Sequence, residues 1–236
     1  MTLVIGFAAS DGTVVASDGQ ITSGTVRTTG KKIYRLGEDN NHCLWSAAGE
    51  LALIQRVEEG IAALPNRGQP LANLRDALCQ VVRAAAESLL RLDFRTQLVP
   101  PQVLLELHPG EFVFAEYREK KPRLLHVFTN GTAEWVPGRV VALGVGAPFA
   151  YALLQKYSEL ALEVSAASLL AYSVVEQAIP VSSYGLGPPI DVWRIDDNGV
   201  GQLSEPEVAM LADAARELRE AELELFRRHG SARASE

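Results

Sequence analysis

The sequence predicts an α+β fold in which two blocks of strands alternate with helices. Short apolar and β-branched runs bounded by turn residues gather in two stretches, residues 2–48 and 102–146. Longer segments whose apolar residues recur at helical spacing follow each stretch. This order of elements is typical of sheets that carry helices on their faces.

The first block predicts four strands and then two helices. Ser10-Asp11-Gly12 is a turn signal between the first two strands. Pro65 and Pro70 separate the helical segments, because proline is disfavoured inside a helix. The predicted strands are residues 2–9, 12–18, 32–36 and 42–48, and the predicted helices are residues 50–64 and 71–92.

The second block repeats this order. Asn130-Gly131 is a strong hairpin-turn signal within it. Ser204 and Glu207 form the capping box of a last helix, predicted over residues 204–228. The other predicted elements are strands at 103–107, 112–117, 124–128 and 140–144, helices at 148–159 and 165–178, and a strand at 190–195.

We expect one domain over residues 1–228, with residues 229–236 as a disordered tail. A chain of 236 residues with 47% hydrophobic residues is long enough for a sizeable single core. A split into two domains near Leu98 is the alternative. Neither half differs in composition from the other, and no flexible linker joins them, so the single domain is favoured.

Composition excludes several classes of function. A net charge of −7 and the absence of a basic patch argue against nucleic acid as a partner. The two cysteines are too few for a disulfide framework, and the four histidines lack metal-ligand spacing. We therefore predict no metal and no cofactor. No signal-peptide pattern and no apolar run of about 18 residues occurs, so we expect a cytoplasmic protein without a membrane partner.

The N-terminal residues suggest a nucleophile. Removal of Met1 would leave Thr2 with both a hydroxyl and a free α-amine, whose ordinary pKa of about 7.7–8.0 suits a general base. A hairpin over residues 2–18 would bring Asp18 beside Thr2, and Lys32 lies shortly after it. Each residue also has an ordinary explanation: a small second residue permits Met removal, Asp-Gly is a turn signal, and Lys-Lys pairs are usually solvated.

This pattern resembles the threonine peptidases of the proteasome β-subunit class, within the N-terminal nucleophile hydrolases. It is similar to the peptidase subunit of a bacterial protease that pairs with an AAA+ unfoldase, and towards its end to the ancestral β-subunit lineage. The residues that carry the resemblance are Val14–Thr22, Gly30–Tyr34, Trp45–Glu50, Phe112–Tyr117, Leu124–Phe128, Ala142–Ala147 and Gly185–Val192.

The resemblance implies a four-layer αββα sandwich and assigns roles to individual residues. Thr2 would be the nucleophile, Asp18 the orienting acid and Lys32 the partner that lowers the pKa of the base. Backbone N–H groups of Ser46 and Ala47 would bind the oxyanion. The substrate pocket would be lined by Ile21, Leu44 and Ala48, which favours cleavage after apolar residues.

Two departures from the family pattern concern the supporting residues. Val145 stands between Gly144 and Gly146, where family members usually have serine. The expected Asp-x-x-Ser pair before the last core strand is not recognisable, and Ser182 and Ser183 are the nearest substitutes.

Three functions remain open at this point. The first is a threonine endopeptidase that acts on unfolded polypeptides. The second is a catalytically inactive ring or scaffold subunit, which the two departures favour. The third is an N-terminal nucleophile amidase that acts on a small amide. The resemblance also implies self-assembly into a ring or stacked rings and an AAA+ unfoldase as partner, although apolar helix faces are equally expected to cover sheets.

Overall fold

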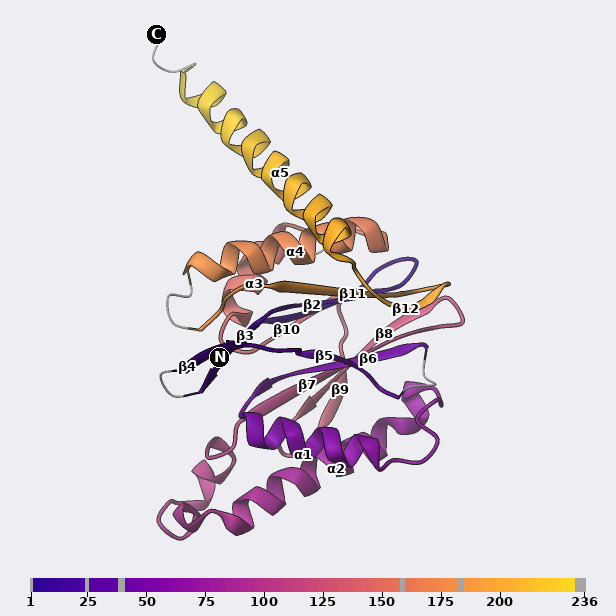
Figure 1. Cartoon of the computed structure of the whole chain (residues 1–236), viewed down its shortest axis with the longest axis vertical. Helices are drawn as coiled ribbons and strands as arrows, with labels where there is room; N and C mark the ends of the chain where they lie inside the picture. The colour runs from indigo at the N-terminus through magenta and orange to yellow at the C-terminus, as the bar shows by residue number, and fades with distance from the viewer. Residues whose placement is uncertain (1, 24–25, 38–40, 158–159, 182–184, 232–236) are drawn as a thin grey trace.

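The computed structural model describes residues 2–23, 26–37, 41–157, 160–181 and 185–231. Two five-stranded sheets pack face to face, and helices cover the outer face of each (Figure 1). This arrangement confirms the predicted αββα sandwich.

The first sheet holds the N-terminal strand in an interior position. Its order is β10-β1-β2-β11-β12, and the neighbouring pairs run antiparallel. The Ser10–Gly12 turn returns the chain from β1 to β2, so that Val4 pairs with Ser17. The strands are β1 (Val4–Ala8), β2 (Thr13–Asp18), β10 (Val140–Leu143), β11 (Ile190–Asp196) and β12 (Gly199–Gln202).

The second sheet has the order β5-β6-β7-β8-β9 and is also antiparallel. The predicted Asn130-Gly131 turn lies between β8 and β9, and Gly131 has a φ of 78°, a conformation that glycine adopts readily. The strands are β5 (Ile33–Arg35), β6 (Cys43–Gly49), β7 (Gly110–Arg118), β8 (Lys121–Phe128) and β9 (Ala133–Trp135).

Helices close both outer faces. The buried residues of α1 (Leu51–Ala62) and α2 (Leu71–Leu92) recur at helical spacing and pack on the second sheet. On the first sheet lie α3 (Ala147–Leu154), the 3₁₀ turn η3 (Gln155–Tyr157) and α4 (Val164–Val181). α4 is long and apolar enough to cross a membrane, but 56% of it is buried inside the molecule, so burial explains its composition.

The final helix, α5 (Glu205–Ser231), packs on α4 near its start and then projects away from the sandwich (Figure 1). The capping box forms as predicted, since the Glu207 carboxylate accepts hydrogen bonds from the N–H and hydroxyl of Ser204. The helix continues to Ser231, so residues 229–231 are not part of a disordered tail. The rest of the predicted tail lies outside the described residues.

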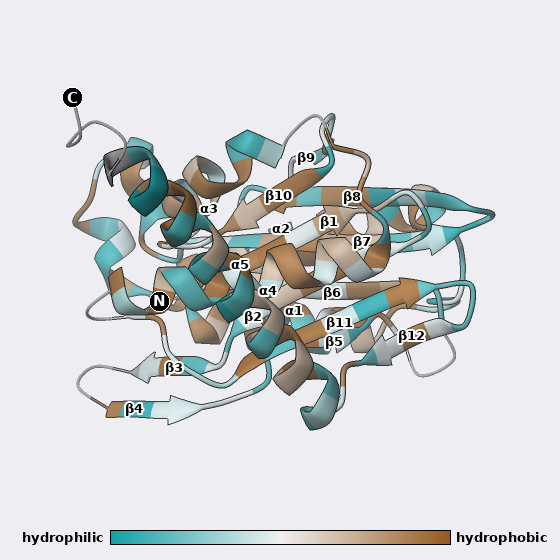
Figure 2. Ribbon diagram, turned by 90° about the horizontal axis from the view of Figure 1, so that it is seen from above, coloured by the Kyte–Doolittle hydropathy of each residue, from teal (hydrophilic) through white to brown (hydrophobic). Residues whose placement is uncertain are grey.

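The prediction from the sequence was wrong or incomplete in several places, and it also lacks the strands β9 and β12. Residues 103–107 are not a strand: Pro101–Glu106 forms the 3₁₀ helix η2, because Pro100-Pro101 removes strand donors and fixes φ in a helical range. A hairpin of β3 (Gln20–Ser23) and β4 (Val26–Thr29), which extends beyond the sandwich (Figure 2), was not predicted. The alternative of two domains split near Leu98 does not hold, because β6 and β7 pair across it within one sheet.

A buried carboxylate anchors α2. Glu116, on β7, is 2% exposed, and its Oε1 accepts a hydrogen bond of 2.7 Å from the backbone N–H of Leu71, the first residue of α2. The side chain therefore satisfies one of the free donors that every helix N-terminus carries.

We predict that Glu116→Ala lowers the free energy of unfolding by about 2 kcal/mol, because it leaves that donor buried and unpaired. Urea unfolding followed by circular dichroism measures this. Glu116→Gln, which keeps an acceptor, should lose clearly less, and Glu87→Ala on the exposed face of α2 serves as the control. Equal stability of Glu116→Ala and wild type would contradict the anchoring role.

Candidate active site

The carboxylate of Asp18, the last residue of β2, is the centre of the site. Its Oδ1 accepts hydrogen bonds from the backbone N–H of Leu3 at 3.0 Å and from Nζ of Lys32 at 2.7 Å. Its Oδ2 accepts from the backbone N–H of Gln20 at 3.1 Å and of Gly187 at 3.2 Å. Four donors thus satisfy a carboxylate that has no exposed surface.

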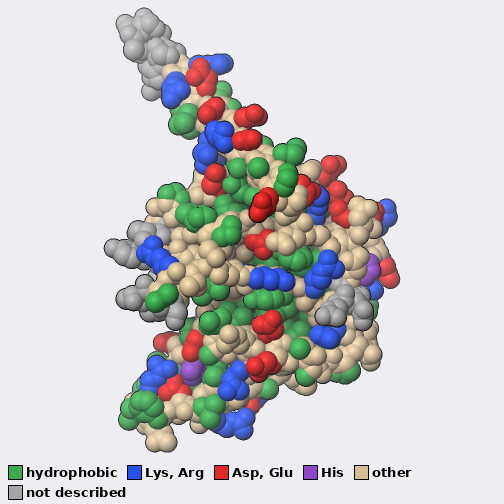
Figure 3. Space-filling view, in the orientation of Figure 1, with side chains coloured by type: hydrophobic (Ala, Val, Ile, Leu, Met, Phe, Trp, Pro, Cys, Tyr) green, Lys and Arg blue, Asp and Glu red, His purple; other side chains and the backbone are tan. Residues whose placement is uncertain are grey.

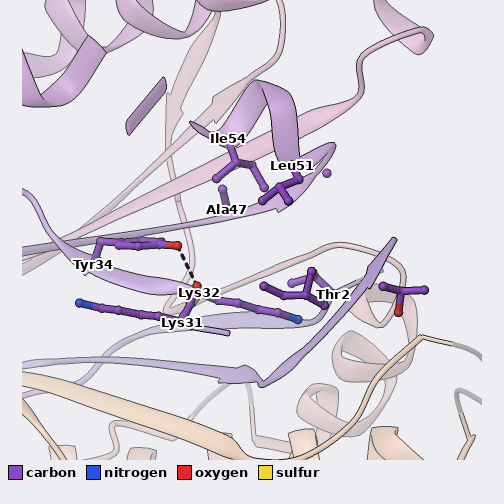
Figure 4. A pocket seen from close by; sticks show the side chains of 10 residues that line it. Thr2, Lys31, Lys32, Tyr34, Ala47, Leu51 and Ile54 are labelled. Carbon is purple, nitrogen blue, oxygen red and sulfur yellow. Dashed lines mark hydrogen bonds between the residues drawn. The ribbon is translucent and has the colours of Figure 1, made fainter. Parts of the chain in front are cut away.

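The Lys32 side chain lies immediately before β5 and is also buried, at 8% exposure. Burial lowers the pKa of its ammonium group, while the charge of Asp18 and the hydrogen bond to it act in the opposite direction. Figure 4 shows Lys32 extended towards Thr2, whereas the neighbouring Lys31 points the other way. The two consecutive lysines therefore have different environments.

Thr2 lies two residues before the start of β1 and, with Lys32, lines a pocket of about 90 Å³. The turn after β10 holds the backbone of Thr2 closely. Gly144 has a φ of 86°, and a Cβ added to it would lie 2.1 Å from the carbonyl oxygen of Thr2. Only glycine therefore fits at this position.

The pocket beside Thr2 is mainly apolar on the side opposite Lys32. Its walls come from the β3–β4 hairpin, from β5, from the end of β6 and from the first turn of α1 (Figure 4). The lining residues are Thr2, Ile21, Thr22, Lys31, Lys32, Tyr34, Ala47, Gly49, Leu51 and Ile54. Aliphatic side chains form one side, and the Lys32 ammonium at the other is already paired with Asp18, so the pocket suits an uncharged, apolar group.

Two of the predicted lining residues were wrong. Ile21 lines the pocket, but Leu44 and Ala48 are buried between the two sheets. Successive side chains of a strand point to opposite faces, so a shift of one residue in the alignment exchanges the faces. Ala47 and Gly49 lie at the pocket instead.

The same alternation revises the predicted oxyanion donors. The N–H of Glu50 donates to the carbonyl of Pro109 at 2.8 Å, so even-numbered residues of β6 direct their N–H groups to β7. Ser46 is one of them, and its hydroxyl donates to the carbonyl of Lys32 at 2.7 Å. The N–H groups of odd-numbered residues are therefore directed away from β7: that of Ala47 towards Lys32, and that of Gly49, which lies beyond the end of β5, towards the pocket that Gly49 lines.

Val145 does not join this group. Val145 is 56% exposed on the turn that contacts Thr2, and it supplies no polar group there. Ser182 and Ser183 lie outside the described residues. Among the residues that the structure describes, no three His, Cys, Asp or Glu side chains lie close enough together to hold a metal ion.

Sequence reasoning missed two backbone groups and most of the pocket. The Gly187 N–H that binds Asp18 carries no side-chain signal. In the sequence, Gly49 was recognisable only as a glycine at the end of a predicted strand. The structure adds that its φ is 142°. Tyr34, Leu51 and Ile54 were assigned to a strand and a helix, since apolar residues at such spacing usually belong to the core.

Comparison with known proteins identifies relatives of this fold. A solved structure of an Anbu (Gly-1) mutant from Hyphomicrobium sp. strain MC1 superimposes with a TM-score of 0.74 at 16% identity, over 96% of each chain. Anbu (ancestral beta-subunit) from Yersinia bercovieri gives a TM-score of 0.72 at 15% identity, over 95% of this chain and 96% of that one. No curated protein gives a significant sequence match.

The family model described as "Proteasome subunit" matches residues 2–187, which include Thr2, Asp18 and Lys32. Both solved structures have the same proteasome-type sandwich of the N-terminal nucleophile hydrolases. The chain therefore belongs to the proteasome subunit family.

Proposed function

We propose that this protein is a threonine endopeptidase that acts on unfolded polypeptides, with Thr2 as nucleophile after removal of Met1. The observation that carries the proposal is the buried contact of 2.7 Å between Lys32 and Asp18 at the pocket that Thr2 lines. A buried ion pair contributes little to stability relative to apolar residues, so its place beside a nucleophile favours a role in chemistry.

The chemistry follows from these positions. The α-amine of Thr2 takes the proton of its own hydroxyl as Oγ attacks the substrate carbonyl carbon. The Gly49 N–H donates to the oxyanion that forms. The protonated amine then gives its proton to the departing amine, and a water molecule hydrolyses the remaining ester. The nearby Lys32 ammonium lowers the pKa of both Thr2 groups, and Asp18 holds that ammonium in place.

Family membership bears on assembly. Proteasome-like subunits generally assemble into rings. We infer the same for this chain and take an AAA+ unfoldase as its partner. Apolar residues stand among charged ones along the projecting part of α5 (Figure 3), including Leu223, Leu225 and Phe226. Such exposed residues support burial against another copy.

The main alternative is an inactive ring subunit. The family includes inactive members. Family members usually have serine at the position of Val145, and valine supplies no polar group there. The hydrogen bonds to Asp18 argue against an inactive subunit, because they keep the Lys32 ammonium beside Thr2. A small-amide hydrolase shares the same chemistry and differs only in substrate.

We predict that the purified protein lacks Met1, cleaves fluorogenic peptides and is labelled at Thr2 by a peptide epoxyketone, which reacts with a hydroxyl and an adjacent free amine. Intact mass, peptide hydrolysis and mapping of the label measure these properties. Thr2→Ala should lose all activity and labelling, and Thr28→Ala, on the exposed strand β4, should keep both.

Retained Met1 without labelling would instead support the inactive subunit. Cleavage of small amides but not peptides, with the same dependence on Thr2, would support the amidase.

We predict that Lys32→Ala lowers kcat by roughly 10²–10⁴-fold, because the Thr2 amine and hydroxyl lose the neighbouring cation. Lys32→Arg should be similarly impaired, since a guanidinium keeps the charge but not the compact geometry or the titratable ammonium. Steady-state kinetics, with circular dichroism as a check on folding, measures the effect. Lys31→Ala, at the adjacent position, should lose far less, and equal losses at both lysines would remove Lys32 from the mechanism.

We predict a preference for cleavage after apolar residues, since aliphatic side chains line the pocket and the Lys32 ammonium would repel a basic side chain. Peptides with Leu before the cleaved bond should exceed those with Lys by about tenfold or more in kcat/KM. Ile54→Glu should reduce this ratio by attracting the basic side chain. If the wild-type protein prefers Lys before the cleaved bond, this pocket does not bind that substrate side chain.

A further inference from the structure

A second buried polar cluster lies next to the site, around His108. The imidazole is 6% exposed, and its Nδ1 lies 2.6 Å from Oε2 of Glu50. Its Nε2 lies 3.2 Å from Oδ2 of Asp93. Within the described part of the chain, that Nε2 has no partner with hydrogen-bond geometry. The mechanism above uses none of these groups.

The charged groups that face His108 come from three elements. Glu50 precedes α1, Asp93 follows α2, and Arg95 belongs to the 3₁₀ helix η1 (Phe94–Gln97). Arg95 forms hydrogen bonds to both oxygens of Asp93, and these lower the pKa of that carboxyl group to about 2. Asp93 is thus already paired, so the well-formed hydrogen bond of His108 is the one to Glu50.

Glu50 connects this cluster to the catalytic corner. It stands between Gly49, whose N–H faces the pocket, and Leu51, which lines it. Its N–H donates to the carbonyl of Pro109, next to His108, and its own carbonyl accepts from the N–H of Ile54. The segment 108–110 therefore holds both the backbone and the side chain of Glu50. A Cβ added to Gly49 would lie 2.3 Å from the Pro109 oxygen, which shows how closely the two segments approach.

We propose that His108 is a positioning residue for the Thr2 site: through Glu50 it fixes the corner that presents the Gly49 N–H and the pocket wall formed by Leu51 and Ile54. The inference rests on the proposed peptidase function. An oxyanion donor acts only when it is aimed at the position where charge develops. A small displacement of the corner would reduce kcat, while the pocket would still bind substrate.

Substitutions at His108 distinguish the role of Nδ1 from that of Nε2. Asparagine places an amide N–H near the position of Nδ1, and glutamine places one near that of Nε2. We expect His108→Ala to lower kcat by about 10-fold to 100-fold, with KM within about twofold of wild type. His108→Asn should recover most of kcat, and His108→Gln should resemble His108→Ala. A purely structural role would not distinguish the two amides.

A matched control and a double variant complete the experiment. His126, on β8, is 8% exposed and also lies between two carboxylates, Glu111 at 3.9 Å and Glu134 at 3.6 Å. His126→Ala should keep the wild-type kcat. Glu50→Ala should lose as much kcat as His108→Ala, and the double variant should lose no more than either. If His108→Ala does not fold, Glu50→Ala carries the test, because its side chain is 36% exposed.

The outcomes are distinct. Wild-type kcat in both Glu50→Ala and folded His108→Ala overturns the inference, as does equal kcat in the asparagine and glutamine variants. A wild-type protein that is neither active nor labelled at Thr2 overturns the proposed peptidase function itself.

Discussion

The fully buried carboxylate of Asp18 constrains the whole site. An ionised carboxyl group away from water is tolerated only when donors surround it. Here the donors come from the residue before β1, from the first residue of β3, from the segment before β11 and from Lys32. Satisfying one charge therefore fixes four parts of the chain relative to Thr2. Loss of the carboxylate would leave Lys32 buried without its counter-ion, so the site and the local fold depend on the same contact.

The strands around Thr2 could be predicted because their signals are local. Residues 3–18 form two mainly apolar runs with a turn between them, and a hairpin returns Asp18 to the level of Leu3. The position of Lys32 was different: nothing in its local sequence distinguishes it from Lys31, and only the family resemblance selected it. The structure supplies the physical distinction, since the two side chains point in opposite directions.

What could not be predicted depends on register and on tertiary environment. Leu44 and Ala48 were placed in the pocket because their faces were assigned by alignment, and a shift of one residue reverses that assignment. The Gly49 and Gly187 N–H groups have no side-chain signature at all. Residues 103–107 have the composition of a strand, yet the preceding prolines and the lack of a pairing partner leave them as a 3₁₀ turn on the surface. The His108 cluster joins residues up to 58 positions apart, a separation at which local patterns carry no information.

The place of β1 inside the first sheet has a mechanical consequence. β1 lies between β10 and β2, and Thr2 precedes it with no intervening loop. Many enzymes carry their reactive group on a segment that can open while the core stays intact. Between Thr2 and β1 there is only Leu3, which is buried and hydrogen-bonded to Asp18, so the proposed nucleophile is tied to the sheet that follows it. If Thr2 is the nucleophile, substrate selection is expected to depend on the elements around it, such as the β3–β4 hairpin and the first turn of α1, and not on movement of Thr2 itself.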